Sequence, residues 1–447
     1  MEVSAPHDSA QARARVSMPT ATPKIGILAG GGRLPLSIAE SVVARGAGVH
    51  IVGIEGEADT AIARFPHTWV SWGQIGRMVD TLHREAGPEL VIAGGVKRPD
   101  LRKIRPDLGF LKSLPKVFAL LAGGDDSVLT RVVRFFEANG FVVRGAHEVA
   151  PELLVREGTI GTTGLSTPAH ADAQIGFAVR SLLGPLDAGQ AVVVAGGRVL
   201  AIEGAEGTDA MLERAQGVRT ALAPLQGGVL AKGPKPGQEL RIDMPAVGPR
   251  TVERAVAAGL DGVALEAGGV LVLDRAEMVR LADAYKFAIA GLPSMGPLHA
   301  PRSTPWISGR LVAKRRPNPR DRADTALGLS AIERLATYGV GGAVVVMSSY
   351  FVAIAAAESV ASMLERVRGL RQWGIGERRR RGVLACRAEK ALPDGGLPVL
   401  FAMASTQGLA GLAVVGTAED LAIFEEDGPA LADAEGMFLI TCRRPLT

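Results

Sequence analysis

Short apolar runs alternate with glycine-rich turns and amphipathic segments over the first third of the chain. Three of these runs predict buried strands: residues 24–29, 50–54 and 90–93. A helical pattern over 35–45 separates the first two runs, and a further strand is predicted at 141–145. Strands that alternate with helices in this way predict an α/β domain with a Rossmann-like, largely parallel sheet over residues 24–150.

Polar and glycine-rich turns follow the predicted strands of this domain, where an open α/β sheet binds its ligands. The turn after the first strand does not fit the GxGxxG pattern of dinucleotide-binding proteins, because an arginine and a leucine lead into Pro35. A basic turn follows the third strand, and a solvated turn is equally compatible with it. The candidate phosphate or substrate contacts here are Gly30, Gly31, Gly32, Gln74, Lys97, Arg98 and Asp126.

A second α/β domain is predicted from about residue 151 to 293. Two apolar runs, 190–195 and 198–202, predict a strand pair joined at two glycines. The turn that follows carries Glu203, Glu206 and Asp209 and opens a helix. These carboxylates are oxygen ligands of the kind a divalent cation prefers. They would equally serve as helix caps, and spacing alone slightly favours that alternative.

Residues 232–251 gather most of the candidate chemistry of this domain. A short strand is predicted there, and its period-2 alternation places Arg241 and Asp243 on one face. Thr251 is the predicted N-cap of the next helix, whose free N–H groups favour an anion. With Lys232, Lys235 and Arg250, these residues suit a phosphate ester and a metal ion or water held against it. A polar hairpin beside a helix is an equally good interpretation.

Composition narrows the class of protein. A chain of 447 residues has room for two or three domains, and its net charge of only +4 argues against a nucleic-acid-binding protein. Two cysteines without metal-site spacing predict no disulfide framework. Residues 1–23 are polar and predict a disordered tail instead of a signal peptide. The uncharged stretch 335–357 contains glycines and a Ser-Ser-Tyr turn, which favour a strand–turn–strand over a membrane helix.

Eight motifs in order support a family resemblance over residues 24–293. They are GILAGGGRLP (26–35), WGQIG (72–76), GGVKRP (94–99), GDDS (124–127), GAHEVAPELL (145–154), EGAEGTDAML (203–212), KPGQELRIDMPAVGPRT (235–251) and LEAGG (265–269). Together they resemble the UDP-2,3-diacylglucosamine diphosphatases of the LpxI type. No single motif is decisive, but eight in register are specific.

The resemblance implies an enzyme of lipid A biosynthesis. It implies a Rossmann-like N-terminal domain, a distinct α/β C-terminal domain and a lipid nucleotide held between them. The implied reaction is hydrolysis of UDP-2,3-diacylglucosamine to UMP and 2,3-diacylglucosamine 1-phosphate, with a divalent cation (Mg²⁺ or Mn²⁺) and water attacking the α-phosphorus. The family's essential aspartate corresponds to Asp243. A cytoplasmic location follows, with peripheral contact at the inner membrane, no nucleic-acid partner, and homo-oligomers as an open alternative.

Within that reaction the candidate residues take provisional roles. Asp243, Arg241 and Lys232 are the candidate catalytic residues. Lys235, Arg250 and Thr251 join the N-terminal turns as substrate contacts. Asp243, Glu203, Glu206 and Asp209 are the candidate metal ligands.

The remainder of the chain holds an internal repeat. After a Pro-, Arg- and Lys-rich segment predicted to be a linker (294–322), residues 343–371 align without a gap to 191–219, with 14 of 29 positions identical. Across the two copies Glu203 aligns with Ala355, Asp209 with Ala361 and Lys232 with Cys386; with gaps, Asp243 aligns with Ala402. About ten residues are missing around the loop 245–251. Residues 323–447 therefore predict a folded, non-catalytic copy that packs on the active domain.

Two other functions remain open on the sequence. A dinucleotide-dependent oxidoreductase is suggested by the glycine-rich βαβ opening, although no histidine is well placed for hydride transfer. A non-catalytic scaffold would follow if the whole chain had lost its chemistry as the second copy has. The intact carboxylates of the first copy argue against a scaffold. The arginine run 378–381 and the basic residues 314–316 would suit anionic headgroups, although a solvated loop is the favoured alternative.

Overall fold

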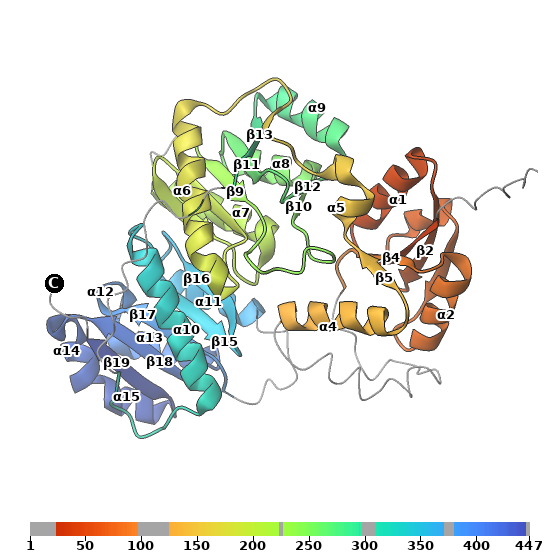
Figure 1. Cartoon of the computed structure of the whole chain (residues 1–447). Helices are drawn as coiled ribbons and strands as arrows, with labels where there is room; N and C mark the ends of the chain where they lie inside the picture. The colour runs from red at the N-terminus through yellow and green to blue at the C-terminus, as the bar shows by residue number, and fades with distance from the viewer. Residues whose placement is uncertain are drawn as a thin grey trace, which may run out of the picture.

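The computed structural model describes residues 24–96, 125–222, 227–294, 296, 309–370 and 380–443, and gives only the backbone of residues 125–128. It shows three α/β units in chain order (Figure 1). Lys97 and Arg98 lie outside the described residues, as does the side chain of Asp126.

The N-terminal unit is a parallel five-stranded sheet in the order β3-β2-β1-β4-β5. This is the strand order of doubly wound nucleotide-binding folds, so the predicted fold class is confirmed. Its strands are β1 (Lys24–Ala29), β2 (Gly48–Ile54), β3 (His67–Val70), β4 (Glu89–Ala93) and β5 (Val142–Arg144). Its helices are α1 (Leu34–Ala44), α2 (Ile75–Glu85), α4 (Asp125–Ala138) and α5 (Ala146–Val149), with the 3-10 turns η1 (Thr60–Arg64) and η2 (Pro151–Leu153).

The second unit, called the first copy below, is a mixed six-stranded sheet in the order β6-β13-β11-β9-β7-β8. Its strands are β6 (Gly158–Ile160), β7 (Ala191–Ala195), β8 (Arg198–Ile202), β9 (Val229–Lys232), β11 (Gly262–Glu266) and β13 (Ala288–Leu292). The surrounding elements are α6 (Thr167–Leu183), η3 (Gly184–Leu186), α7 (Gly207–Ala221), α8 (Pro249–Ala257), α9 (Arg275–Tyr285) and the strand pair β10 (Ala246–Val247) and β12 (Leu271–Val272). The sequence of β7 is apolar throughout because both faces of this sheet are covered.

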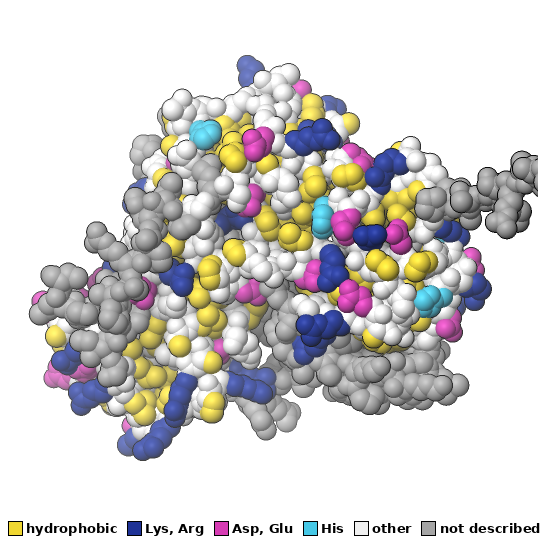
Figure 2. All heavy atoms as spheres, in the orientation of Figure 1, with side chains coloured by type: hydrophobic (Ala, Val, Ile, Leu, Met, Phe, Trp, Pro, Cys, Tyr) yellow, Lys and Arg dark blue, Asp and Glu magenta, His cyan; other side chains and the backbone are white. Residues whose placement is uncertain are grey.

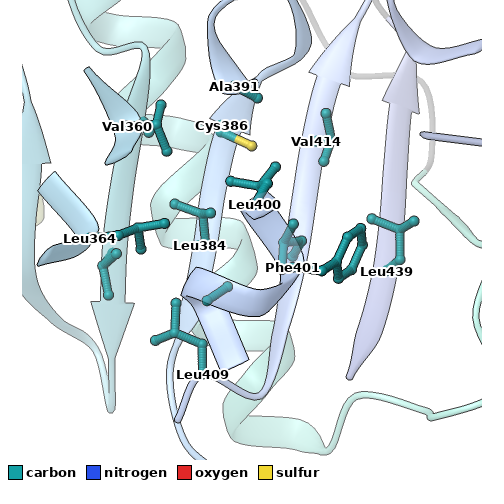
Figure 3. Close-up of a cluster of buried hydrophobic side chains, with 14 of the residues drawn as sticks. Val360, Leu364, Leu384, Cys386, Ala391, Leu400, Phe401, Leu409, Val414 and Leu439 are labelled. Carbon is teal, nitrogen blue, oxygen red and sulfur yellow. The ribbon is translucent and has the colours of Figure 1, made fainter. Parts of the chain in front are cut away.

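The third unit, called the second copy, repeats that sheet strand for strand in the order β14-β19-β18-β17-β15-β16. Its strands are β14 (Arg310–Leu311), β15 (Ala343–Met347), β16 (Tyr350–Ala355), β17 (Val383–Arg387), β18 (Gly411–Gly416) and β19 (Phe438–Arg443). Its helices are α10 (Pro319–Ala336), α11 (Val360–Leu370), α12 (Ala388–Ala391), α13 (Gly396–Thr406), α14 (Ala418–Glu426) and α15 (Gly428–Ala434). Figure 3 shows its core, in which Leu400 and Phe401 of α13 pack toward Leu384 and Val414 of the sheet.

The second copy begins earlier in the chain than the sequence comparison of the two copies indicated. β14 pairs antiparallel with β19 as β6 pairs with β13, and α10 begins at Pro319. The second copy therefore starts inside the segment 294–322 predicted to be a linker. The part of that segment from residue 309 on was misassigned, because β14 has two residues and its neighbours are prolines and basic residues.

The placement of the gap in the repeat was wrong as well. Between β17 and β18 the chain forms α12 and α13, so α13 occupies the place that α8 has between β9 and β11. Ala402 lies inside α13 and is not the counterpart of Asp243. The missing residues come from the loop before the helix, where the second copy has the short helix α12.

The two copies share one hydrophobic core. Side chains of α6, β7 and β8 pack in one cluster with side chains of α10, β15 and β16. α6 and α10 lie side by side in Figure 1, and the Arg334 guanidinium of α10 donates to the Leu182 carbonyl of α6 (3.3 Å). The predicted strand–turn–strand is confirmed as β15 and β16, and no helix among the described residues is long and apolar enough to cross a bilayer.

Candidate active site

A polar pocket of about 180 Å³ lies where the first copy meets the second. Three loops of the first copy and strand β16 of the second copy enclose it. Its charged and amide side chains are Asp187, Gln190, Glu203, Lys235, Gln238 and Asp243. The loop that carries Asp243 also packs on the N-terminal domain, since Ile242 and Met244 join hydrophobic clusters of that domain. The pocket is therefore built close to all three units.

Strand direction brings Glu203 and Lys232 together. β8 and β9 are both antiparallel to β7, so they run the same way and end at the same edge of the sheet. Glu203 follows β8, and Lys232 is the last residue of β9. Carboxyl ends of strands are where α/β sheets bind ligands.

Thr208 connects these two buried charges. The Lys232 ammonium donates to the Thr208 hydroxyl (2.9 Å) and to the Ala246 carbonyl (3.1 Å). The same hydroxyl donates to one carboxylate oxygen of Glu203 (3.1 Å). The other oxygen of Glu203 is buried without a hydrogen-bond partner among the described residues. A buried acceptor left in this state is costly unless a ligand or an ion completes it.

Burial shifts both groups toward their neutral forms. Desolvation raises the pKa of the Glu203 carboxyl, and the nearby Lys232 charge only partly opposes it. Desolvation likewise lowers the pKa of the Lys232 ammonium, which is opposed by the negative charges of Glu203, Asp209 and Asp243. Opposite shifts of this kind are common in catalytic sites.

Asp243 lies in a turn, so the prediction of a strand at this position was wrong. The Asp243 and Ile242 amides both donate to the Glu239 carbonyl (3.0 and 3.2 Å). The Asp243 carboxylate accepts from the buried Gln238 amide (2.5 Å), whose own oxygen accepts from the Lys235 backbone amide (3.0 Å). The carboxylate is thereby held at the pocket wall.

Arg241 does not share a face with Asp243, because a turn has no period-2 alternation. Its guanidinium donates to Glu239 (2.8 Å) and to Glu137 of helix α4 (2.8 Å). These carboxylates raise the pKa of the Arg241 guanidinium above its ordinary value. Arg241 thus joins the loop to the N-terminal domain, and its catalytic role stays a prediction.

The four predicted metal ligands do not form one cluster. Glu206 is buried in ion pairs with Arg214 (2.5 Å) and Arg366 (3.4 Å), and Asp209 pairs with Arg250 (2.9 Å). Among the residues that the structure describes, no three His, Cys, Asp or Glu side chains are arranged to hold a metal ion. Glu203 and Asp243 remain together at the pocket.

Two domain models and one curated relative show what the chain is similar to. The model of the LpxI N-terminal domain matches residues 24–153, and that of the LpxI C-terminal domain matches twice, at 156–290 and 308–440. The chain belongs to the LpxI family. UDP-2,3-diacylglucosamine pyrophosphatase LpxI of Caulobacter vibrioides is 39% identical over 272 residues, which cover 60% of this chain and 97% of that relative. The resemblance inferred from the eight motifs is thereby confirmed.

The other predicted contacts of this LpxI-family chain have structural partners. In the N-terminal turn, the Gly30 and Gly31 amides donate to the Ala93 and Gly95 carbonyls (2.8 and 2.6 Å), and a Cβ on Gly30 would lie 2.6 Å from the Gly95 oxygen. Gly32 has φ +91°, which favours glycine. The Gln74 side chain accepts from the Ser71 amide (3.1 Å).

The cap of α8 differs from the prediction. Gly248 is its N-cap, and Thr251 is the third helical residue, whose hydroxyl accepts from the Gly248 amide (3.4 Å). Lys235 pairs with Asp187 (2.8 Å) at the pocket. The sequence analysis missed Gln238 and Asp187, because a lone amide or carboxylate in a turn carries no spacing signal. It also missed Thr208, which did have a signal as a hydroxyl between Glu203 and Asp209.

Proposed function

We propose that this chain hydrolyses the pyrophosphate of UDP-2,3-diacylglucosamine to UMP and 2,3-diacylglucosamine 1-phosphate. The observation that carries the proposal is the pocket that holds Asp243 and Glu203 beside the buried Lys232, in a chain that covers nearly all of a relative named for that activity. A pyrophosphate needs its charge neutralised and a water held in line with the leaving group.

The proposed cofactor is a divalent cation, Mg²⁺ or Mn²⁺. The site fits such an ion through the Asp243 carboxylate and the Glu203 oxygen that has no hydrogen-bond partner among the described residues. Mg²⁺ commonly takes one or two protein carboxylates and completes its shell with water and substrate phosphates, so a larger protein cluster is not required. When bound, the cation would neutralise the pyrophosphate and make its phosphorus more electrophilic.

The chain's own residues would act around that ion. The proposed role of Asp243 is to orient the attacking water toward the α-phosphorus, with Gln238 holding the carboxylate in place. Lys232 is fixed by Thr208 and Ala246, and its ammonium would stabilise charge on the phosphate oxygens without moving. Lys235, which lines the pocket and pairs with Asp187, would contact the nucleotide phosphates, and Arg250, which pairs with Asp209, is proposed as a second, exposed contact.

We also propose that the enzyme works in the cytoplasm and meets its lipid substrate at the inner membrane surface. Figure 2 shows Lys and Arg side chains scattered among acidic ones over one face. Lys314 pairs with Asp433 (3.4 Å) while staying exposed, and Arg315 donates to the Gly436 carbonyl (2.6 Å), so both cations contact the surface of the second copy. Arg378 and Arg379 of the predicted basic run lie outside the described residues.

The test is UMP release from UDP-2,3-diacylglucosamine by the purified full chain with Mg²⁺ or Mn²⁺, beside Asp243→Ala and Asp243→Asn. We expect UMP from the wild type and a loss on the order of 10³-fold in both variants, since each removes the charge at the reacting centre. A folded wild type that releases no UMP with either metal would refute the proposal and redirect work to a nicotinamide-binding titration. Equal activity in wild type and variants would keep the function and remove Asp243 from it.

A further inference from the structure

The second copy forms one wall of the pocket. Tyr350 and Phe351, the first two residues of β16, line it together with Glu203 and Asp243. Tyr350 is half-buried and Phe351 is buried. Both residues belong to the second match of the LpxI C-terminal domain model, at 308–440.

The same strand holds the turn that carries Glu203. The Ala205 amide donates to the Val352 carbonyl (3.1 Å), which ties this turn to β16. A Cβ on Gly204 would lie 2.9 Å from the Val352 oxygen and 3.4 Å from the Ala353 Cα. The backbone of the turn therefore rests directly on the second copy, with no room for a side chain between them.

A buried network of four charges fixes the two copies immediately behind this turn. Glu206 and Glu358 each pair with both Arg214 and Arg366, at 2.5 to 3.4 Å, and no member is more than 18% exposed. The two arginines also donate to the Ile202 and Ile354 carbonyls (3.0 and 3.1 Å). Buried charges with this many partners hold one relative orientation.

These contacts are reciprocal, as at a two-fold interface between subunits. The equivalent residues in the two copies lie 152 positions apart, and the Ala357 amide donates to the Leu200 carbonyl (3.4 Å) as Ala205 does to Val352. The equivalent turn in the second copy has Ala355 in place of Glu203. One of the two equivalent positions therefore has the acid and the other does not.

We infer that the second copy acts as a built-in partner subunit, which completes the pocket with Tyr350 and holds Glu203 in place through β16. Tyr350 is thus a positioning residue for the reaction of the first copy. The kinetic part of this inference rests on the proposed pyrophosphatase function. The structural part, the ordering of the 203–207 turn, does not.

The experiment compares Tyr350→Ala, Tyr350→Arg and Tyr350→Phe in the full chain, with Arg198→Ala as the matched control. Arg198 occupies the equivalent position in the first copy and begins β8, whose Leu200 carbonyl accepts from Ala357 in the turn that lacks the acid. Each variant is measured for UMP release, for amide hydrogen exchange of residues 203–207 and for melting temperature. Tyr350→Arg introduces the residue that Arg198 provides at the start of β8. It therefore offers a second variant that can be measured if Tyr350→Ala does not fold.

We expect Tyr350→Ala and Tyr350→Arg to lower kcat about tenfold, with faster exchange at 203–207, because a small displacement of a reacting group is costly. Tyr350→Phe keeps the ring and restores most of the rate, and Arg198→Ala leaves rate and exchange unchanged. Rates and exchange in the folded Tyr350 variants equal to those of Arg198→Ala would overturn the inference. A wild type without UMP release, with exchange at 203–207 still raised in Tyr350→Ala, would refute the proposed function and leave the second copy as the support of this turn.

Discussion

The two copies of the C-terminal domain keep the same packing. In each copy, an aspartate on a helix accepts hydrogen bonds from two backbone amides of the turn that joins the antiparallel strand pair. Asp172 accepts from Gly196 and Gly197 in the turn between β7 and β8 (3.0 and 2.7 Å). Asp324 accepts from Ser348 and Ser349 in the turn between β15 and β16 (2.8 and 2.7 Å). Both serines have the positive φ that the glycines have, so the turn survives residues that disfavour it. The aspartate holds the turn, and the turn sets the register of the strand pair.

The copies differ where the chemistry would be. The buried cation Lys232 is replaced by Cys386, whose pKa is raised by burial to about 12, so that this position is neutral near pH 7. Thr208 and Glu203 are replaced by Val360 and Ala355. Sequence change has thus removed the polar set of one copy while its core and its shared interface remain. The buried polar residues Glu203, Thr208 and Lys232 are therefore not required to stabilise this fold.

The largest expected effect comes from making the first copy chemically like the second. The double variant Glu203→Gln with Lys232→Met removes both buried charges and nearly keeps side-chain volume. We expect UMP release to fall at least about 10³-fold. The free energy of unfolding should stay within about 2 kcal/mol of wild type or increase, because replacing a buried ion pair by neutral groups is often neutral or stabilising. Steady-state kinetics and urea denaturation measure the two effects.

Lys232→Met alone is the control for that pair. It leaves Glu203 buried without its nearest opposite charge, and the carboxyl can respond by protonation. A double variant that unfolds below 25 °C would contradict the conclusion that the polar set is dispensable for folding. A double variant that retains UMP release would show that neither Glu203 nor Lys232 is needed for the reaction.

The second expected effect concerns the charges that both copies retain. Glu206→Gln and Glu358→Gln each leave two buried arginines short of an anion, and the parent carboxylates are equally buried (5% and 4% exposed). Each variant should lose about 2–4 kcal/mol of unfolding free energy, and the two losses should match. The control is Glu277→Gln, which breaks an exposed pair with Arg280 and should cost under about 1 kcal/mol. A loss in only one of the two variants would contradict the reciprocal interface.

The sequence predicted the fold of both copies because apolar periodicity records which faces are buried. It placed β7, β8, β15 and β16 correctly, since these strands are apolar runs around a turn. It failed at 239–243, where Leu240 and Ile242 alternate as in a strand but instead anchor a turn to the neighbouring domain. Alternation shows which side chains are buried, but not the element that buries them.

The sequence predicted several residues of the candidate site, but not which of them lie together in the structure. Glu203, Glu206 and Asp209 share one short turn, and carboxylates so close in sequence suggested one cation site. The structure separates them, because the helix start turns Glu206 toward Arg366 of the second copy and Asp209 toward Arg250. A partner 160 residues away in the chain leaves no local signal. The contribution of Tyr350 to the pocket was missed for the same reason.

The smallest expected effect is a displaced pH profile that belongs to the first copy alone. Burial raises the pKa of the Glu203 carboxyl above the ordinary value of a glutamate, and the proposed role needs its ionised form. Activity should therefore fall as the pH drops through that raised pKa, at a higher pH than an exposed glutamate would give. Glu203→Gln should lack this acidic limb while keeping a low, flat rate. The measurement is kcat/KM for UMP release between pH 5 and 9.

Stability provides an independent check with the sign fixed by linkage. A carboxyl with a raised pKa in the folded state contributes stability that is fully present below its unfolded pKa, near 4.5, and lost as the pH rises through its folded value. Wild type should therefore lose stability relative to Glu203→Gln as the pH rises above about 4.5. No such difference is expected for Ala355→Gln, the equivalent change in the second copy, because no acid titrates there. If the unfolding free energies of wild type and Glu203→Gln changed in parallel with pH, the pKa of Glu203 would not be raised in the folded state. The chemical contrast between the copies would then rest on Lys232 and Asp243.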